Sequence, residues 1–167
     1  MIGMIGMIEM IEMIEQKPFF FRIPVEIVLV HPLAEVPFYA TEGSSGFDLK
    51  ACIDAPITLK KRTWQLISSG YRVSVPYGFE IQIRPRSGLA LKKGITVKNT
   101  PGTVDADYRG VMGVILYNES DEDFVIEPGE RIAQAVVCPV YHAEFYVVKE
   151  LSETSRGEGG FGSTGTK

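Results

Sequence analysis

Short runs of β-branched and aromatic residues, separated by Gly and Pro, recur along most of this chain and limit the folds open to it. In FEIQIR, Phe79, Ile81 and Ile83 alternate with polar residues, which is the period of a half-buried strand. Similar runs elsewhere predict further strands. The predicted segments are 25–30, 47–53, 64–76, 79–85, 111–118, 124–140 and 143–149. The chain is therefore expected to be all-β, as a barrel or a jelly-roll sandwich.

One segment departs from this pattern. SGLALKKG, residues 87–94, predicts a short helix. Ser87 is expected to cap its amino end, and Gly94 to end its last turn. Leu89 and Leu91 are expected to reach the core.

Composition narrows the class of protein. The 167 residues are 45% hydrophobic and 23% charged, which suits one globular domain with its own core. The net charge of −4 gives no overall positive field for a nucleic-acid backbone or an anionic membrane. No apolar run approaches the roughly 20 residues of a membrane span. We therefore expect a cytoplasmic protein that binds neither nucleic acid nor membrane.

Cysteine and histidine are sparse. Cys52 and Cys138 are isolated, and with His31 and His142 they form no pair at metal-ligand spacing. This argues against a zinc site and against a disulfide-stapled secreted scaffold.

The first 18 residues contain the repeat MIGMIGMIEMIEMIE. The segment lacks an early Lys or Arg and carries Glu9, Glu12 and Glu15, so it does not fit a signal peptide. A three-residue step drifts around a helix instead of forming one face. We interpret 1–18 as a low-complexity extension in preference to a partner-binding helix, and 19–152 as the folded β domain.

The last segment, 153–167, ends in SRGEGGFGSTGTK, which holds five glycines. Glycine loses more conformational freedom on ordering than any other residue, so a flexible arm is expected. Two interpretations are open. The arm is either a solvated tail, or a mobile element whose Arg156, Phe161, Ser163 and Thr164 close over a ligand.

RPRSGLA, residues 84–90, has the composition of a phosphate site. A helix amino terminus presents free N–H groups, Arg86 adds a planar cation and Ser87 adds a hydroxyl donor. The alternative is that Ser87 only caps the helix and Arg86 is a surface charge.

KNTPGTVDADYRG, residues 98–110, is a turn-rich loop with two acids. A carboxylate in such a loop could act as a general base on a water, and Tyr108 could stack on a sugar or base. The alternative is that its two acids, Asp105 and Asp107, serve only as turn formers.

Two further polar residues lie between apolar neighbours. Gln134 is expected to share one strand face with Ile132 and Val136, so it needs a partner or faces a cavity. Asp48 lies between Phe47 and Leu49, where it could simply pair with an arginine.

Five segments, in order, resemble the motifs of the homotrimeric dUTPases: GFDLKA, PRSGLA, GTVDADYRG, GERIAQ and RGEGGFGSTG. The resemblance runs from about Val25 to the end of the chain. It implies a jelly-roll-like β-barrel with one short helix, assembled as a homotrimer whose active sites are shared between subunits. It also implies Mg²⁺-dependent hydrolysis of dUTP to dUMP and pyrophosphate, which limits uracil in DNA and supplies the precursor of dTMP.

The resemblance also implies residue roles. Asp105 matches the general base. Asp48 and Gln134 would orient the water shell of Mg²⁺ and the α-phosphate without ligating the metal. Substrate binding would fall to Arg86, Ser87, Gly88, Asn99, Thr103, Val104, Tyr108, Gln134, Arg156, Phe161, Gly162, Ser163 and Thr164.

Two rival functions remain at this stage. A dCTP deaminase of the same fold resembles the region too, but the glutamate that family uses is matched here by Ile115. A non-catalytic dUTP sensor would be expected to have lost the base or the arm, yet Asp105, Arg156 and Phe161 are present.

Overall fold

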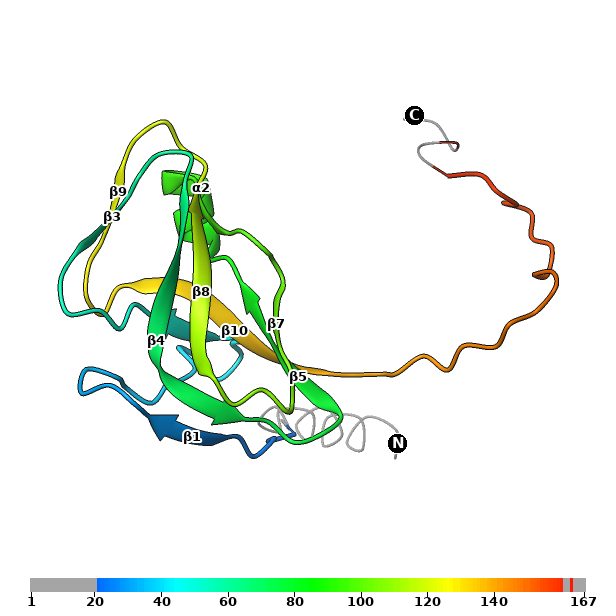
Figure 1. Cartoon of the computed structure of the whole chain (residues 1–167), viewed down its shortest axis with the longest axis horizontal. Coiled ribbons are helices and arrows are strands. Elements are labelled where there is room, and N and C mark those ends of the chain that lie inside the picture. Colours follow the sequence, from blue (N-terminus) through cyan, green and yellow to red (C-terminus); the bar gives the residue numbers. More distant parts are fainter. Residues whose placement is uncertain (1–20, 161–162, 164–167) are drawn as a thin grey trace, which may run out of the picture.

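The computed structural model describes residues 21–160 and 163. Within these residues the chain forms strands and one short helix, all shown in Figure 1. They are β1 (Glu26–Leu29), β2 (Phe47–Lys50), β3 (Ile57–Leu59), β4 (Trp64–Ser74), β5 (Phe79–Arg84), α2 (Ser87–Lys93), β6 (Ile95–Val97), β7 (Gly102–Val104), β8 (Val111–Asn118), β9 (Phe124–Ile126) and β10 (Arg131–Pro139).

The strands build two four-stranded sheets and a two-stranded ribbon. The first sheet has the order β1-β4-β8-β6, the second β2-β10-β5-β7, and β3 pairs with β9. All of these pairs are antiparallel. One buried cluster joins both sheets, with Ile67 and Leu116 from the first and Leu49 and Ile81 from the second. The predicted all-β, jelly-roll-like fold is confirmed.

The alternation that predicted β5 places its apolar side chains in the core. Ile81 and Ile83 are buried, and Phe79 packs against the core at the strand's start. β8 alternates over its whole length, with Met112 and Leu116 buried. Each sheet therefore has one core face and one outer face.

Helix α2 agrees only partly with its prediction. Gly94 ends it in the left-handed conformation (φ 64°), and its N–H donates to the carbonyls of Ala90 and Leu89. Ser87 does not cap it, because the N-cap is Arg86 and no side chain provides a capping bond. Leu89 packs against the core, whereas Leu91 is exposed, since residues two apart point about 200° away from each other around a helix.

Several strand predictions need correction. The run 124–140 is two strands, β9 and β10. Its part PGERIAQAVV is a turn into a strand, as the sequence indicates, and in this turn the Glu130 N–H donates to the Glu127 carbonyl. β3, β6 and β7 were not predicted, because three residues are too few to show alternation. Residues 143–149, all of which the structure describes, form no strand, since the chain leaves the body after β10 (Figure 1) and has no neighbouring strand to pair with.

The buried side chain of Asn118 stabilises the end of β8. It is fully buried, and its amide donates to the carbonyls of Leu59 and Glu122, while its oxygen accepts from Ser120. Every polar atom of this buried amide thereby has a partner.

Both cysteines are free, so no disulfide links them. Burial, with a smaller contribution from the charge of Asp54, raises the pKa of the Cys52 thiol. Among residues 21–160 and 163, no helix has the length and hydrophobicity to cross a membrane.

Candidate active site

One row of polar residues crosses the outer face of the second sheet. Gln134 on β10 lies opposite Asp48 on β2 and opposite Arg84 on β5. Directly opposed residues point to the same face of a sheet, so these three side chains lie side by side. The row ends where β5 leads into Pro85, Arg86 and helix α2.

Gln134 is half-buried, and its Nε2 donates to the Pro85 carbonyl at 2.9 Å. It therefore has a partner in the loop that carries Arg86. The expectation that Ile132 shares its face is wrong. A bulge between Arg131 and Ala133 turns Ile132 into the core, where it is fully buried.

Asp48 is held by two arginines. Its Oδ1 lies 2.9 Å from Arg86 Nε, and its Oδ2 accepts from Arg131 Nη1 at 3.1 Å. Arg86 Nη1 also donates to the Arg131 carbonyl at 2.9 Å. Asp48 thus pairs with arginine, as one of the two interpretations predicted, and fixes Arg86 at the start of α2.

An open depression of about 510 Å³ lies beside Asp48 and its two arginines, which together form the Asp48 clamp. Three of the side chains that line it are cations: Lys50, Arg86 and Arg131. Lys50 is bound to Glu35 at 2.6 Å, and its ammonium lies 5.8 Å from the centroid of the Phe38 ring. Phe38 and the acidic Glu130 also line the depression, so it combines three cations with one carboxylate and an aromatic ring.

The start of α2 opens toward solvent at this place. Ser87 and Gly88 are exposed, and Arg86 is extended at the N-cap. The first N–H groups of a helix have no carbonyl partner within it, and no side chain caps this helix. Arginine, hydroxyl and free N–H groups together form a cradle for an anion such as phosphate.

The second group of predicted residues lies on the connection from β6 to β8. Thr103 and Val104 belong to β7, opposite Gln82 and Ile81 of β5. A side-chain carbon at Gly102 would lie 3.1 Å from the Asn99 amide nitrogen, so glycine permits this close approach. Asn99 and Thr103 are both exposed.

Asp105 follows β7 at the start of a turn. The Tyr108 N–H donates to the Asp105 carbonyl at 3.1 Å, and Tyr108 Oη donates to the Val111 carbonyl at 3.2 Å. Within residues 21–160 and 163, no hydrogen bond or ion pair engages the Asp105 carboxylate, which is exposed. Asp105 therefore forms a turn through its backbone, while its carboxylate faces solvent.

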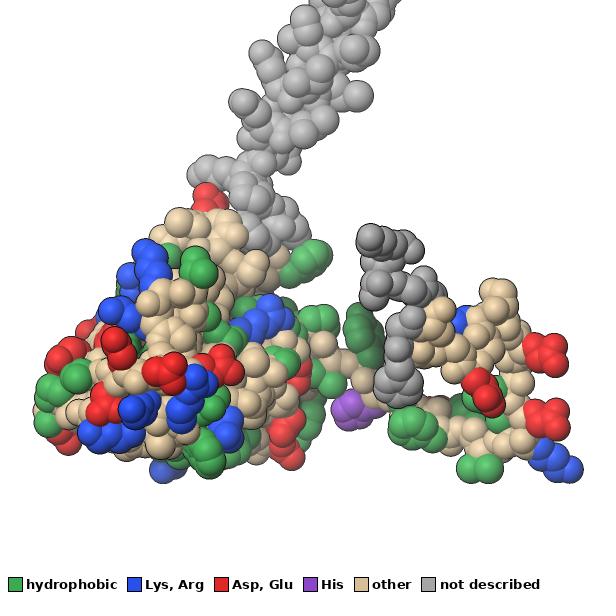
Figure 2. Space-filling view, turned by 90° about the horizontal axis from the view of Figure 1, so that it is seen from above, with side chains coloured by type: hydrophobic (Ala, Val, Ile, Leu, Met, Phe, Trp, Pro, Cys, Tyr) green, Lys and Arg blue, Asp and Glu red, His purple; other side chains and the backbone are tan. Residues whose placement is uncertain are grey.

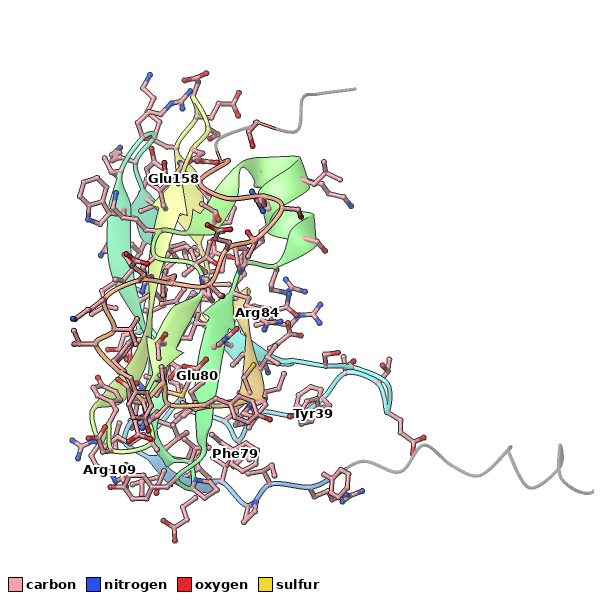
Figure 3. All side chains as sticks on the ribbon, turned by 90° about the vertical axis from the view of Figure 1, so that its right-hand side faces the viewer. Tyr39, Phe79, Glu80, Arg84, Arg109 and Glu158 are labelled. Carbon is pink, nitrogen blue, oxygen red and sulfur yellow. The ribbon has the colours of Figure 1, made fainter. Side chains whose placement is uncertain are left out.

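Within one chain the two groups lie at opposite ends of β5. Asp105 follows Val104, which is paired with Ile81, whereas Arg86 comes after the other end of the strand. A strand advances about 3.3 Å per residue, so Ile81 and Arg86 lie roughly 16 Å apart along it. In Figure 3, Arg84 lies on the side of α2, and Phe79 and Arg109 lie at the opposite end of the molecule.

The C-terminal arm stands away from both groups (Figure 1). Within it, Arg156 Nε donates to the Gly159 carbonyl at 2.8 Å, and the Ser163 N–H donates to the Gly160 carbonyl. The predicted residues Phe161, Gly162 and Thr164 lie outside the described residues. The structure thus brings together Asp48, Gln134, Arg86, Ser87 and Gly88, and separately Asn99, Thr103, Val104, Asp105 and Tyr108.

Comparison with known proteins assigns this arrangement to a family. A family model described as dUTPase matches residues 33–165. The chain belongs to the dUTPase family. The match begins later than the predicted Val25 and spans all five dUTPase motifs.

Curated dUTPase relatives agree over most of their length. A deoxyuridine 5'-triphosphate nucleotidohydrolase of Syntrophotalea carbinolica is 48% identical over 143 residues, which is 86% of this chain and 97% of the relative. One from Hydrogenobaculum is 56% identical over 134 residues, covering 80% and 92%.

Solved dUTPase structures share the fold. A mutant dUTPase of phage 80alpha superimposes with a TM-score of 0.76 at 26% identity, over 84% of this chain and 98% of that one. Another mutant of the Staphylococcus bacteriophage 80alpha dUTPase, solved with dUpNHpp, gives 0.74 at 25% identity, over 85% and 98%.

Two residues of the candidate site were not identified from the sequence. Arg131 completes the clamp on Asp48, and Lys50 lines the depression, but neither was among the predicted site residues. Both residues are cations that lie within the motifs GERIAQ and GFDLKA, and this could have indicated them. The pairing of β2 with β10, which places Arg131 opposite Lys50, could not be inferred from the sequence.

Proposed function

We propose that the chain hydrolyses dUTP at the α-phosphate to give dUMP and pyrophosphate. Its family membership supports this reaction, and one observation in the structure carries it. Arg86 is fixed by Asp48 at the open amino end of α2, beside Ser87 and Gly88. A preorganised cation with free N–H groups suits the triphosphate of a nucleotide.

Asp105 is proposed as the general base. Its exposed carboxylate would accept a proton from the water that attacks the α-phosphorus, and pyrophosphate would leave as the bond to the bridging oxygen breaks. No covalent nucleophile is required, because positioning and charge neutralisation account for most of phosphoryl-transfer catalysis.

The phosphate side of the site is proposed to be built by the second sheet. Arg86, Ser87 and Gly88 would bind phosphate oxygens. Gln134, which holds the Pro85 carbonyl, would keep this loop in place and orient the α-phosphate. Asp48 would act mainly through Arg86, because both of its oxygens are engaged by arginines.

The nucleoside side is proposed to be read by the segment 99–104. Asn99 and the backbone of Thr103 and Val104 would bind the uracil edge, and a mismatched donor or acceptor left unpaired costs about 1–3 kcal/mol. The Tyr108 ring would lie under deoxyribose and leave no room for a 2′-hydroxyl. Phe161 would stack on uracil.

Mg²⁺ is proposed as the cofactor, held by the substrate. Among residues 21–160 and 163, no three His, Cys, Asp or Glu side chains gather to hold a metal ion. An ion that keeps several of its waters and binds mostly the phosphate oxygens of the substrate needs no such protein cluster, and Mg²⁺ commonly binds in this way. Bound there, Mg²⁺ would neutralise phosphate charge, with Asp48 and Gln134 nearest to its water shell.

A homotrimer with shared sites is proposed because one copy does not bring its own catalytic groups together. Asp105 and Arg86 lie at opposite ends of β5, so a second copy must supply one of them. The segment 141–151, which follows β10, supports association too. Its side chains Tyr141, Phe145 and Leu151 are almost fully exposed, and Figure 2 shows hydrophobic side chains along the part of the chain that projects from the body.

The segment 153–167 is proposed to serve as a lid. Arg156 and the turn at Ser163 and Thr164 would hold the γ-phosphate, and glycines at 157, 159, 160 and 162 let backbone approach it. Substrate would supply the ordering energy, so closure would be coupled to correct binding.

The test is pyrophosphate release from dUTP with Mg²⁺, beside dTTP, dCTP and UTP. Release confined to dUTP is the expected result. Tight dUTP binding without release would favour the sensor, and ammonia release from dCTP would favour the deaminase. Ammonia release from dCTP is not expected, because Ile115 on β8 is apolar at the position where the dCTP deaminases have their glutamate.

A further inference from the structure

Lys98 directly precedes Asn99, and two aromatic rings hold its side chain. The ammonium lies 3.4 Å from the centroid of the Trp64 ring and 4.9 Å from that of Tyr117. A cation at such distances over aromatic faces is attracted by their negative π-clouds. Among the described residues, Lys98 forms no salt bridge, so these rings are its charge partners.

The first sheet builds this contact from three of its strands. Trp64 on β4 lies opposite Tyr117 on β8, and Tyr117 lies opposite Thr96 on β6. Lys98 comes two residues after Thr96, so it points to the same outer face. The two rings meet edge to face at 6.3 Å and 66°, and the ammonium lies 3.4 Å and 4.9 Å from their centroids.

Lys98 is also the last residue between β6 and β7 whose backbone forms a hydrogen bond with β8 of the first sheet. Its N–H donates to the Ile115 carbonyl at 2.8 Å. The chain then turns, with the Thr100 N–H donating to the Val97 carbonyl at 3.1 Å, and joins the second sheet at Gly102. Side chain and backbone therefore fix the same residue at the crossing between sheets.

We infer that Lys98 is a positioning residue for uracil recognition, acting through its contact with Trp64 and Tyr117. The contact sets where the segment 99–104 leaves the first sheet, and so where the Asn99 amide and the Val104 backbone meet the base. This inference rests on the function proposed for that segment. Loss of the contact lets the segment shift, which weakens uracil binding and the rejection of cytosine.

The test replaces Lys98 by Met, which keeps the length of the side chain and removes its charge. The variant is expected to raise KM for dUTP about two- to fivefold, the value of one partly exposed cation–π contact, with kcat unchanged. The preference for dUTP over dCTP is expected to fall. Lys98→Arg is expected to keep the wild-type KM for dUTP and the wild-type preference for dUTP, because a guanidinium also stacks on aromatic rings. Lys92→Met, at an exposed position of α2, is the matched control.

Fluorescence supplies a second readout, because Trp64 is the only tryptophan of the chain. Removing a charge from its ring in Lys98→Met is expected to shift its emission. If the emission shifts but KM and the dUTP preference stay as in the wild type, the contact is merely structural and the inference is overturned. Wild-type turnover of dUTP, measured in the same assay, tests the proposed function separately.

Discussion

Asp48 and Arg86 form a salt bridge of 2.9 Å between Oδ1 and Nε, and Arg131 occupies the other carboxylate oxygen. Both side chains of the bridge are only about a quarter exposed, at 23% and 27%. Water therefore screens the bridge less than it screens a surface pair. The arginine proposed to bind phosphate is thus fixed before substrate arrives.

Asp48→Asn should release Arg86 and weaken nucleotide binding. A hydrogen bond to a charged group contributes about 1.5–3 kcal/mol, so a loss of roughly tenfold in affinity is expected at the lower end of that range. Calorimetric titration with a non-hydrolysable dUTP analogue measures it. Asp121→Asn, which breaks the exposed bridge to Arg62, is the control. Unchanged affinity would show that Arg86 needs no clamp.

Asp105→Asn should abolish turnover and spare binding. Losing a general base costs about 10²–10⁴-fold in rate, whereas the amide keeps the size of the side chain. Pyrophosphate release and analogue titration separate the two effects. Asp107→Asn, an exposed acid of the same loop, is expected to remain active. Equal losses in both variants would point to the loop's conformation instead of a base.

Subunits mixed from two inactive variants should regain activity if the sites are shared. When Asp105→Asn and Arg86→Ala chains are refolded together, about one quarter of the sites would combine an intact Asp105 with an intact Arg86. Turnover of the mixture, compared with each variant refolded alone, is the measurement. No recovery would place both groups of each site in one chain.

Deleting residues 155–167 should leave the body folded and cut turnover severely. The arm stands away from the sheets, so its removal exposes no core (Figure 1). Thermal unfolding and dUTP turnover are measured together, with a chain lacking residues 1–18 as the comparison, which is expected to stay active. Near-normal turnover after the C-terminal deletion would rule out the lid.

Asn118→Ala should lower the free energy of unfolding by about 2–4 kcal/mol. The change removes the buried hydrogen bond to the Leu59 carbonyl and the bond from the Ser120 N–H, and it leaves a cavity in place of a fully buried side chain. Denaturant titration measures the loss. Glu119→Ala removes an exposed neighbouring side chain and is expected to change little. Similar losses in both variants would mean that the end of β8 contributes by its backbone alone.

The local parts of the fold could be predicted from the sequence. β5 follows from the alternation of FEIQIR, and β8 from the β-branched and aromatic residues of VMGVILYN, because both signals lie in the segment itself. Gly94 ends α2 as expected, because the left-handed turn is a property of that one residue. The segment 143–149 was wrongly predicted as a strand, since β-forming side chains specify a strand only where a neighbour is available to pair.

The site could be predicted by residue but not by arrangement. Asp48, Arg86 and Gln134 were identified individually, while the row that unites them depends on the pairing of β2, β10 and β5. Arg131 escaped because its role comes from the register, not from its neighbours in the sequence. The distance between Asp105 and Arg86 likewise follows from β7 pairing with β5, which no local pattern encodes.

β10 lies between β2 and β5 in the second sheet, although it is the last strand in the chain order. During synthesis the chain emerges from its amino end, so β2 and β5 wait for the residues that hold them together. Gln134 and Arg131, which secure the phosphate cradle, arrive with that same strand. The proposed nucleotide site therefore requires β10, and an incomplete translation product that lacks this strand is expected not to sequester dUTP.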